Sequence, residues 1–302
     1  MIVSNEDLNA ARETIRYIED RFNHQHHYPW ILLNYQYFRA DFKKYIQKAT
    51  SSPVYFGKID PEAWNYPNWI DVSRAEKSIL ELFNLYKGDS MSYHQQLRYQ
   101  AGLFFHHPLF KNVEYAWRVE PGSHYSCDID IDPFGVMKKE NKKLGFVIAM
   151  QEESDAITTL WPTTKLFIEN YPQYIKPTKD TIMSWIIEND NGGDMDDAYY
   201  NNCHIWTNFE IVDLSFLRSK EYQLYFNHLD KAGGFFYEKW GDTIHTLAAA
   251  MFLDKSQVHF FDQIGYSKSD ISHCPINPTS FNKCTCDPKM LLNWNLVVRR
   301  VK

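Results

Sequence analysis

The stretch that decides the fold reads Trp117-Arg118-Val119-Glu120-Pro121-Gly122. Along a β-strand, alternation sends Trp117 and Val119 to one face and Arg118 and Glu120 to the other. Pro121-Gly122 then ends the strand and turns the chain, which places Glu120 at a strand's carboxyl end. Ligands bind at that edge of open α/β sheets, so this carboxylate is a candidate site residue.

A second acidic segment begins eight residues after Glu120. Asp128, Asp130 and Asp132 alternate with isoleucines, which is typical of a strand with one acidic face. Two acidic groups that converge on one sheet edge indicate a divalent cation and the phosphates it holds. We therefore expect the aspartates to lie close to Glu120.

The composition of the 302-residue chain limits its function classes. Apolar residues make up 44% and aromatic residues 16%, which is ample for a folded core. The formal net charge of −6 argues against a nucleic-acid or anionic-membrane binder. The chain shows no signal peptide and no apolar run long enough to span a membrane, and Met1-Ile2-Val3 reads as the interior of a first strand.

The five cysteines favour disulfides over a metal site. Cys284 and Cys286 are separated by one residue, which is not the spacing of the usual zinc pairs. Their clustering with Cys274 is typical of disulfide-bonded segments and would imply a secretory compartment. Buried free thiols are the alternative, because such thiols are common.

Strand-like and helix-like segments alternate along the chain, which predicts an α/β domain with a largely parallel sheet. The predicted helices cover an apolar stripe at Leu8, Ala11, Ile15 and Ile18 and residues 74–85, and the predicted strands are 30–33, 54–56, 117–120 and 144–149. The acidic stretch 188–197 fits a surface loop better than a domain linker. We therefore expect a single domain over residues 1–302.

Three other stretches hold residue types suited to chemistry. On a helix, Tyr93 shares a face with Leu97, and Arg98 is a candidate phosphate ligand. Glu210 lies between apolar neighbours, so it is either paired within the fold or held for function. The glycine pair and three aromatic residues of the segment 233–242 predict a loop that stacks on sugars, with an aromatic core as the alternative.

Taken in order, several long motifs identify a family. They are YHQQLRYQAG (93–102), WRVEPG (117–122), CDIDIDPF (127–134), TNFEIVDLSFLRS (207–219), LDKAGGFFYEKWGD (229–242), VHFFDQIGY (258–266) and HCP (273–275). The chain resembles the fungal Ktr/Mnt (Kre-type) family of α-1,2-mannosyltransferases, glycosyltransferase family 15, over essentially its whole length.

The resemblance implies a fold, a reaction and a location. The fold would be the GT-A-type, Rossmann-like fold of nucleotide-diphospho-sugar transferases, with a mostly parallel central sheet flanked by helices. The reaction would move mannose from GDP-mannose to a mannoside or glycoprotein glycan acceptor, with retention of the α configuration and with Mn²⁺. Family members are type II membrane proteins of the Golgi lumen, so this chain would be a catalytic domain without its anchor and stem.

The resemblance also implies roles for individual residues. Glu120 takes the place of the acidic metal-site residue, which gives Asp128, Asp130 and Asp132 supporting roles. Tyr93 matches a tyrosine near the donor and the reacting centre, and Glu210 matches the proposed nucleophile. Arg98, Arg118 and Asp242 are the candidate donor-binding residues, with ion pairing inside the fold as the alternative for either arginine.

Three departures from the family affect the expected site. The family usually carries two histidines after Ile-Gly-Tyr, where this chain has Ser267 and Lys268. A protonated lysine repels Mn²⁺ and can itself neutralise diphosphate, so we expect weakened metal dependence. The segment from Asp242 to His245 is one residue shorter than in the family, and Cys284-Thr285-Cys286 lacks a further family cysteine downstream.

Three functions remain open on the sequence alone. The first is an active retaining mannosyltransferase, in which Glu210 either attacks the sugar or stabilises its positive charge during same-face transfer. The second is a lapsed relative that binds GDP or a mannoside without turnover. The third is a retaining glycoside hydrolase that uses Glu210 and a second carboxylate.

Overall fold

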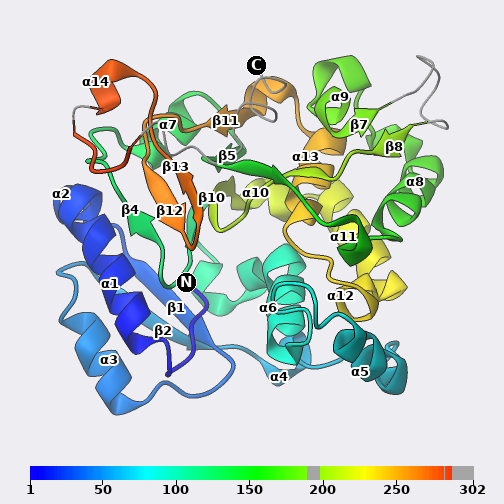
Figure 1. The fold of residues 1–302 in the computed structure, drawn as a ribbon, viewed down its shortest axis with the longest axis horizontal. Coiled ribbons are helices and arrows are strands. Elements are labelled where there is room, and N and C mark those ends of the chain that lie inside the picture. Colours follow the sequence, from blue (N-terminus) through cyan, green and yellow to red (C-terminus); the bar gives the residue numbers. More distant parts are fainter. Residues whose placement is uncertain (189–197, 282, 288–302) are drawn as a thin grey trace.

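Helices surround several small sheets in the computed structural model, which describes residues 1–188, 198–281 and 283–287 (Figure 1). The α/β fold class expected from the sequence is confirmed. The loop expected at 188–197 lies, beyond its first residue, outside the described residues. No helix within the described ranges is long and apolar enough to cross a membrane.

The secondary structure consists mainly of short helices and strands. The strands are β1 (Trp30–Asn34), β2 (Val54–Lys58), β3 (Tyr115–Val119), β4 (His124–Tyr125), β5 (Leu144–Phe146), β6 (Ala149–Gln151), β7 (Ile187–Glu188), β8 (Tyr199–Tyr200), β9 (Cys203–Ile205), β10 (Phe209–Asp213), β11 (Val258–Phe260), β12 (Tyr266–Lys268) and β13 (Ile271–His273). The α-helices are α1 (Leu8–Ile18), α2 (His24–His26), α3 (Ala40–Gln47), α4 (Pro61–Trp64), α5 (Val72–Glu81), α6 (Met91–Gly102), α7 (Pro133–Lys139), α8 (Leu160–Asn170), α9 (Met183–Ile186), α10 (Leu214–Leu217), α11 (Lys220–Ala232), α12 (Gly234–Tyr237), α13 (Thr243–Phe252) and α14 (Pro278–Phe281).

The N-terminal part, blue in Figure 1, is a parallel strand pair with α1 and α3 beside it. β1 and β2 pair from Trp30 opposite Val54 onward, and Ile2 bridges to Leu33 in parallel. The predicted apolar stripe of α1 is largely confirmed, because Ala11, Ile15 and Ile18 are buried and Leu8 packs at their edge. The predicted strands 30–33 and 54–56 are also confirmed.

The central sheet has the order β11-β5-β10-β3, and its strand directions are mixed. β11 runs parallel to β5, but β10 runs antiparallel to both β5 and β3. The expectation of a mostly parallel central sheet is therefore wrong for this sheet. The physical reason is the chain path, since β5 continues into β6 and the chain returns antiparallel through β9 before it enters β10.

The predicted strand 144–149 is interrupted. Residues 144–146 form β5, the backbone bends at Val147, and β6 begins at Ala149. The two halves pair with different strands, β10 and β9. This apolar run therefore contains two buried strands. Periodicity alone does not distinguish two such strands from a single longer one.

The two faces of the central sheet contact different cores. Trp117 and Val119 pack into the core that also holds α1 and α3, together with Phe209 and Ile211 of β10. Val212 packs into the larger core beneath α6, α11 and α13. The alternation predicted for residues 117–120 is confirmed, and the second face is the one that carries the polar residues described below.

The aromatic segment after α11 belongs to the core and not to a sugar-stacking loop. Phe235, Phe236 and Trp240 are fully buried, and residues 234–237 form α12. Gly233 has a φ of +81° and ends α11 in the left-handed conformation, which glycine adopts without strain. A Cβ at Gly234 would lie 2.1 Å from the Trp240 ring, so close packing explains the second glycine.

The aspartates after Glu120 do not join it. Asp128 forms an exposed ion pair with Arg21, and Asp130 forms one with Lys283. Asp132 caps α7 by accepting a hydrogen bond from the Phe134 N–H. The predicted strand and its convergence on the metal site are wrong, because the segment forms one bridge at Cys127 and then turns into α7.

Two disulfides confirm the expectation drawn from the cysteines. Cys127 bonds to Cys284, and Cys274 bonds to Cys286. Both cysteines of the Cys284-Thr285-Cys286 segment are thus paired without a further downstream cysteine. One bridge attaches this segment to Cys274, directly after β13, and the other attaches it to Cys127, two residues after β4. Both β4 and β13 pair with β12.

Candidate active site

A pair of charged residues faces across two neighbouring strands. Glu210 of β10 lies directly opposite Arg118 of β3 in the antiparallel register. Directly opposite residues project from the same face of a sheet, so these side chains meet on the face covered by α6 and α13. Glu120 follows β3 by one residue and projects from that same face.

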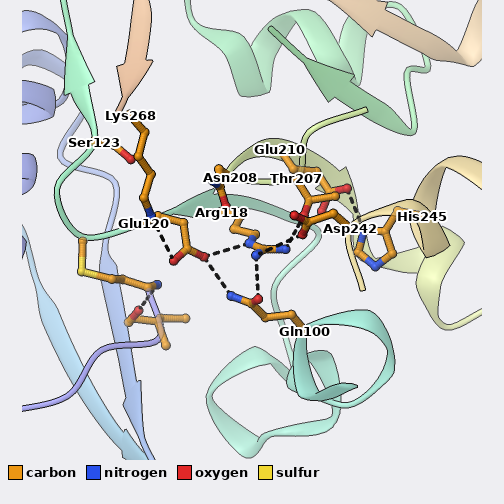
Figure 2. Close-up of polar contacts among 12 residues, drawn as sticks. Gln100, Arg118, Glu120, Ser123, Thr207, Asn208, Glu210, Asp242, His245 and Lys268 are labelled. Carbon is orange, nitrogen blue, oxygen red and sulfur yellow. Dashed lines mark hydrogen bonds and ion pairs between the residues drawn. The ribbon is translucent and has the colours of Figure 1, made fainter. Parts of the chain in front are cut away.

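The Arg118 guanidinium is the centre of a polar network (Figure 2). Its Nε donates to Glu120 Oε1 at 3.0 Å, and its Nη1 donates to the Thr207 hydroxyl at 2.6 Å. Its Nη2 donates to Gln100 Oε1 at 2.6 Å and lies 3.8 Å from Asp242 Oδ1. Burial alone would lower the pKa of Arg118, but Glu120, Asp242 and Glu210 hold it above its ordinary value.

Glu120 is buried and ionised. Besides Arg118, the Gln100 amide donates to its Oε1 at 2.9 Å, and the Lys268 ammonium lies 3.8 Å from its Oε2. Burial raises the pKa of Glu120, but the two cations and the hydrogen bonds outweigh burial and bring the pKa below its ordinary value. The strand-end carboxylate predicted from the sequence is therefore an anion held among cations.

Asp242 joins the network from the residue just before α13. Its Oδ1 accepts a hydrogen bond from the Thr207 hydroxyl at 2.5 Å. Burial would raise the pKa of Asp242, and the neighbouring Arg118 together with the Thr207 bond lowers it overall. The segment between Asp242 and His245 is short, yet α13 starts at once with Thr243, so the missing residue does not disrupt the helix.

Tyr93 stands on the same helix as Gln100, seven residues earlier, which is two turns along one face of α6. Burial and the nearby charge of Asp242 raise the pKa of Tyr93 well above its ordinary value, and Glu120 adds to this effect. Its phenol therefore stays protonated at neutral pH and is able to donate a hydrogen bond. The structure thus brings Tyr93 to the network that Arg118 centres.

Glu210 has a second partner beneath the network. Its Oε1 lies 2.7 Å from Nδ1 of His245 on α13, and the Glu210 residue is only 1% exposed. The other ring nitrogen of His245 lies 3.3 Å from the carbonyl oxygen of Ala101 in the last turn of α6. Glu210 is thus held between Arg118 on the neighbouring strand and His245 on the covering helix.

Arg98 lies in a different environment. Its Nε and Nη2 form a bidentate ion pair with Asp230 of α11 at 2.6 and 2.9 Å, and its Nη1 donates to the Ala63 carbonyl at 3.0 Å. These contacts join α6 to α11 and to α4. They favour a structural role for Arg98 over the donor-binding role expected from the sequence.

Three site residues have no place in the sequence-based prediction. Gln100 and Thr207 bridge the charged groups, and His245 holds Glu210. Uncharged polar residues carry little signal in a sequence, although the seven-residue spacing from Tyr93 points to Gln100 once the helix is assumed.

The residues around Glu120 fit a divalent cation only in part. Within the described residues, the grouping of three potential metal ligands is Cys127, Cys284 and Cys286, all of which are disulfide-bonded. Glu120 offers one buried, ionised carboxylate, and other ligands would come from the phosphates of a bound nucleotide. Lys268 lies where its charge opposes a cation at that carboxylate.

Comparisons with known proteins find relatives over nearly the whole chain. The model of the family described as glycolipid 2-alpha-mannosyltransferase matches residues 1–298. An O-glycoside alpha-1,2-mannosyltransferase of Schizosaccharomyces pombe is 41% identical over 97% of this chain and 74% of the relative. The glycolipid 2-alpha-mannosyltransferase 1 of Candida albicans is 42% identical over 97% of this chain and 67% of the relative.

Solved structures are similar to the whole fold. The core-mannan synthase A of Aspergillus fumigatus, in an Mn/GDP form, superposes with a TM-score of 0.87 at 37% identity and covers 95% of this chain and 77% of that protein. The Ktr4p mannosyltransferase of Saccharomyces cerevisiae in complex with GDP gives a TM-score of 0.89 at 36% identity, over 97% of this chain and 76% of that protein. The chain is therefore a member of the glycolipid 2-alpha-mannosyltransferase family, as its motifs had indicated.

Proposed function

We propose that this protein is a retaining α-1,2-mannosyltransferase that moves mannose from GDP-mannose to mannose-terminated glycans of glycoproteins. Family membership supports the reaction, because several relatives are named α-1,2-mannosyltransferases. The GDP and manganese in the similar solved structures support the donor. The described chain would be a single catalytic domain over residues 1–302.

One observation of the structure carries this proposal. A single guanidinium, Arg118, lies among three buried carboxylates at a strand's carboxyl end: Glu120, Asp242 and Glu210. Such a group costs folding free energy, because buried charges are expensive when they are unbalanced, and groups of this kind cluster at functional sites. A nucleotide sugar fits such a site, because its diphosphate would be stabilised by the cations and its sugar, which becomes positively charged during transfer, by the carboxylates.

The cations of the site would act on the leaving group. The diphosphate of GDP-mannose gains negative charge as the glycosidic bond breaks, and fixed positive groups stabilise that charge without reorganisation. Arg118 and Lys268 are the candidates, since both lie beside Glu120. Tyr93 would donate a hydrogen bond from its protonated phenol to the donor.

Glu210 would act on the sugar. A retaining reaction requires either attack by a carboxylate or same-face departure and entry with a nearby anion. Direct attack needs a carboxylate oxygen in contact with the anomeric carbon, and Glu210 is almost fully buried with one oxygen bonded to His245. This geometry favours the second route, in which Glu210 stabilises positive charge on the mannose.

Manganese would be held by Glu120 and by the donor phosphates, where it would supply further positive charge to the leaving diphosphate. Lys268 supports the proposal that this dependence is weakened, because its ammonium already faces Glu120 at 3.8 Å. The Golgi lumen is the proposed location. The two disulfides support it, since such bonds persist in secretory compartments.

The function is tested by transfer from GDP-mannose to methyl-α-mannoside, with Mn²⁺ and with EDTA, beside a Glu210→Gln control. We expect an α-1,2-linked dimannoside, and a loss of about 100-fold or more in turnover for Glu210→Gln. Absence of transfer with GDP still bound would replace the proposal with a noncatalytic binding relative. Release of mannose from a mannoside without nucleotide would indicate a hydrolase.

The metal proposal is tested separately by Lys268→His. Exchange of an ammonium for an imidazole removes the repulsion and adds a ligand, so we expect Mn²⁺ binding in the presence of GDP to tighten by about tenfold. Titration calorimetry measures this without turnover. The matched control is Lys283→His, at a surface lysine paired with Asp130, which should leave Mn²⁺ binding unchanged. A steep loss of wild-type turnover on chelation, restored by Mn²⁺, would contradict weakened dependence.

A further inference from the structure

The segment 82–90, which joins α5 to α6, exposes large apolar side chains to water (Figure 1). Phe83 is 66% exposed and Tyr86 is 62% exposed, and Leu80 near the end of α5 is 69% exposed. Apolar side chains that gather on the surface are typical of places where a ligand or partner binds. The groups proposed to act on the donor and on its mannose include none of these three residues.

The backbone of the segment is a series of turns that fixes where its side chains point. The N–H groups of Leu82, Leu85 and Gly88 each donate to the carbonyl oxygen three residues earlier, at 3.2, 2.9 and 2.9 Å. Bonds of this kind bring side chains that are three residues apart onto one face. Phe83 and Tyr86 therefore share a face of the segment.

Contacts with α6 hold the end of the segment in place. The Gly88 carbonyl oxygen lies 2.7 Å from Nε2 of the buried His94. A Cβ at Gly88 would lie 2.1 Å from the Leu82 carbonyl oxygen, so the turn closes too tightly for a side chain there. Lys87 has a φ of +53°, a conformation that is uncommon for residues other than glycine and that clusters at ligand sites. The segment is thus a fixed platform.

This platform places Tyr86 next to Tyr93 of the candidate active site. The two rings meet edge to face, with 6.1 Å between their centroids and an interplanar angle of 87°. The Lys87 ammonium lies 5.5 Å from the centroid of Tyr86 and 5.4 Å from that of Tyr93, so cation–π attraction holds the rings together. Tyr93 also lies close enough to Asp242 and Glu120 for their charges to raise its pKa. It therefore links the charged network to the exposed ring.

An exposed aromatic ring at this place suits a sugar. The C–H groups on one face of a pyranose are apolar and weakly positive, and the face of an aromatic ring is negative, so the two surfaces attract. The hydroxyls at the edge of the sugar stay in water, which avoids the cost of burying them. The 6.1 Å between the Tyr86 and Tyr93 centroids is close to the separation of two pyranose rings joined by one glycosidic bond.

We propose that Tyr86 is an acceptor subsite, which stacks on the second sugar of a glycan whose terminal mannose lies beside Tyr93. This inference rests on the proposed function, since it takes Tyr93 to mark the reacting centre. The acceptor class is then a chain of two or more mannose residues in preference to a single mannoside. Because the platform is already fixed, stacking on it does not require the loop to be ordered first.

A comparison of two acceptors tests the subsite. We expect kcat/KM for α-1,2-mannobiose to exceed that for methyl-α-mannoside by about fivefold, mainly through a lower KM. Tyr86→Ala should remove this preference and leave kcat/KM for methyl-α-mannoside within about twofold, whereas Tyr86→Phe keeps the ring and should keep the preference. The matched control is Tyr45→Ala on α3, an exposed tyrosine whose ring centroid lies 5.8 Å from the Lys44 ammonium, and it should behave as the wild type.

Three outcomes would overturn the inference. The first is a wild-type protein that uses both acceptors equally well. The second is an equal loss for both acceptors in Tyr86→Ala, which would mean that Tyr86 only supports Tyr93. The third is a preference for octyl-α-mannoside over mannobiose that Tyr86→Ala removes, which would assign the exposed surface to an apolar aglycone.

Titration calorimetry with mannobiose in the presence of GDP separates this inference from the proposed function. Mannobiose binding that Tyr86→Ala weakens by about fivefold, in a protein that transfers no mannose, would contradict the function and leave the subsite standing. Transfer to methyl-α-mannoside without any gain for mannobiose would contradict the inference alone. Tyr86 is exposed, so its substitution should leave the fold intact, and circular dichroism of each variant checks this.

Discussion

Arg98 and Arg118 both place a guanidinium beside a buried carboxylate, yet their surroundings differ. Arg98 has one carboxylate partner, Asp230, and a carbonyl, so its charge is matched one to one among packed helices. Arg118 meets Glu120, Asp242 and Glu210 at the end of a strand. The first arrangement is complete without a ligand, and the second is not. Charge balance, more than burial, therefore separates an ion pair of the fold from a site.

The largest expected effect comes from breaking the balanced pair. Arg98→Met leaves Asp230 as an unpaired buried charge between α6 and α11, so we expect the free energy of unfolding to fall by about 3–5 kcal/mol. Chemical denaturation followed by circular dichroism measures the loss. Turnover per folded molecule should stay within about twofold, because Arg98 is proposed to be structural.

A double variant sharpens this result. In Arg98→Met with Asp230→Leu both charges are gone, and apolar side chains fill a region whose neighbours are already apolar. We expect most of the lost stability to return, since replacing a whole buried pair is often close to neutral. If the double variant were less stable than Arg98→Met, or if the single variant lost turnover while folded, the division between the two arginines would be wrong.

Arg118→Lys is expected to have the opposite effect, with a large loss of turnover and a small loss of stability. Lysine keeps the charge but cannot donate at once to Glu120, Thr207 and Gln100, as the guanidinium does. We expect kcat to fall by about 100-fold, or roughly 2.7 kcal/mol of transition-state stabilisation, with a change in unfolding free energy below about 1 kcal/mol. Steady-state kinetics and denaturation on the same preparation compare the two. A stability loss as large as that of Arg98→Met would place Arg118 with the structural residues.

The sequence predicted the parts of the site that depend on local geometry. The alternation of residues 117–120 placed Arg118 and Glu120 on one face because the strand pleat has a fixed period of two. Tyr93 and Glu210 were candidates from their local patterns and received their roles from the resemblance, and the structure brings both to Arg118. The clustering of three cysteines predicted that disulfides form, but it did not predict which cysteines pair with each other.

The rest depends on contacts between distant segments. The antiparallel direction of β10 follows from the path of the chain through β6 and β9, which no local pattern encodes. Asp128 and Asp132 alternate as in a strand, but their partners are Arg21 and the cap of α7. His245 was invisible as a partner of Glu210 because the two are separated by 35 residues and lie on different elements. The periodicity of side chains within one element is thus predictable from the sequence, whereas the partners that a strand or side chain finds in distant segments are not.

The smallest expected effect concerns His94, which lies near the structural residue Arg98 on α6. His94 lies one turn before Arg98 on the buried face of α6, between the carbonyls of Gly88 and Phe235. Burial lowers its pKa below the ordinary value of 6.5, so the unfolded chain binds the proton at a higher pH than the folded protein. Stability from this residue is full above pH 6.5 and is lost as the pH falls through 6.5 toward the folded pKa.

We expect the unfolding free energy of the wild-type protein to decrease between pH 7.5 and 5.5, with His94 contributing at most about 1.4 kcal/mol per pH unit. His94→Gln should be less stable at pH 7.5 and should show a flatter dependence on pH. Arg118→Lys should keep the wild-type slope, because its effect lies in turnover. A slope unchanged in His94→Gln would mean that other histidines, such as His259, whose pKa burial also lowers, govern the acid sensitivity of the fold.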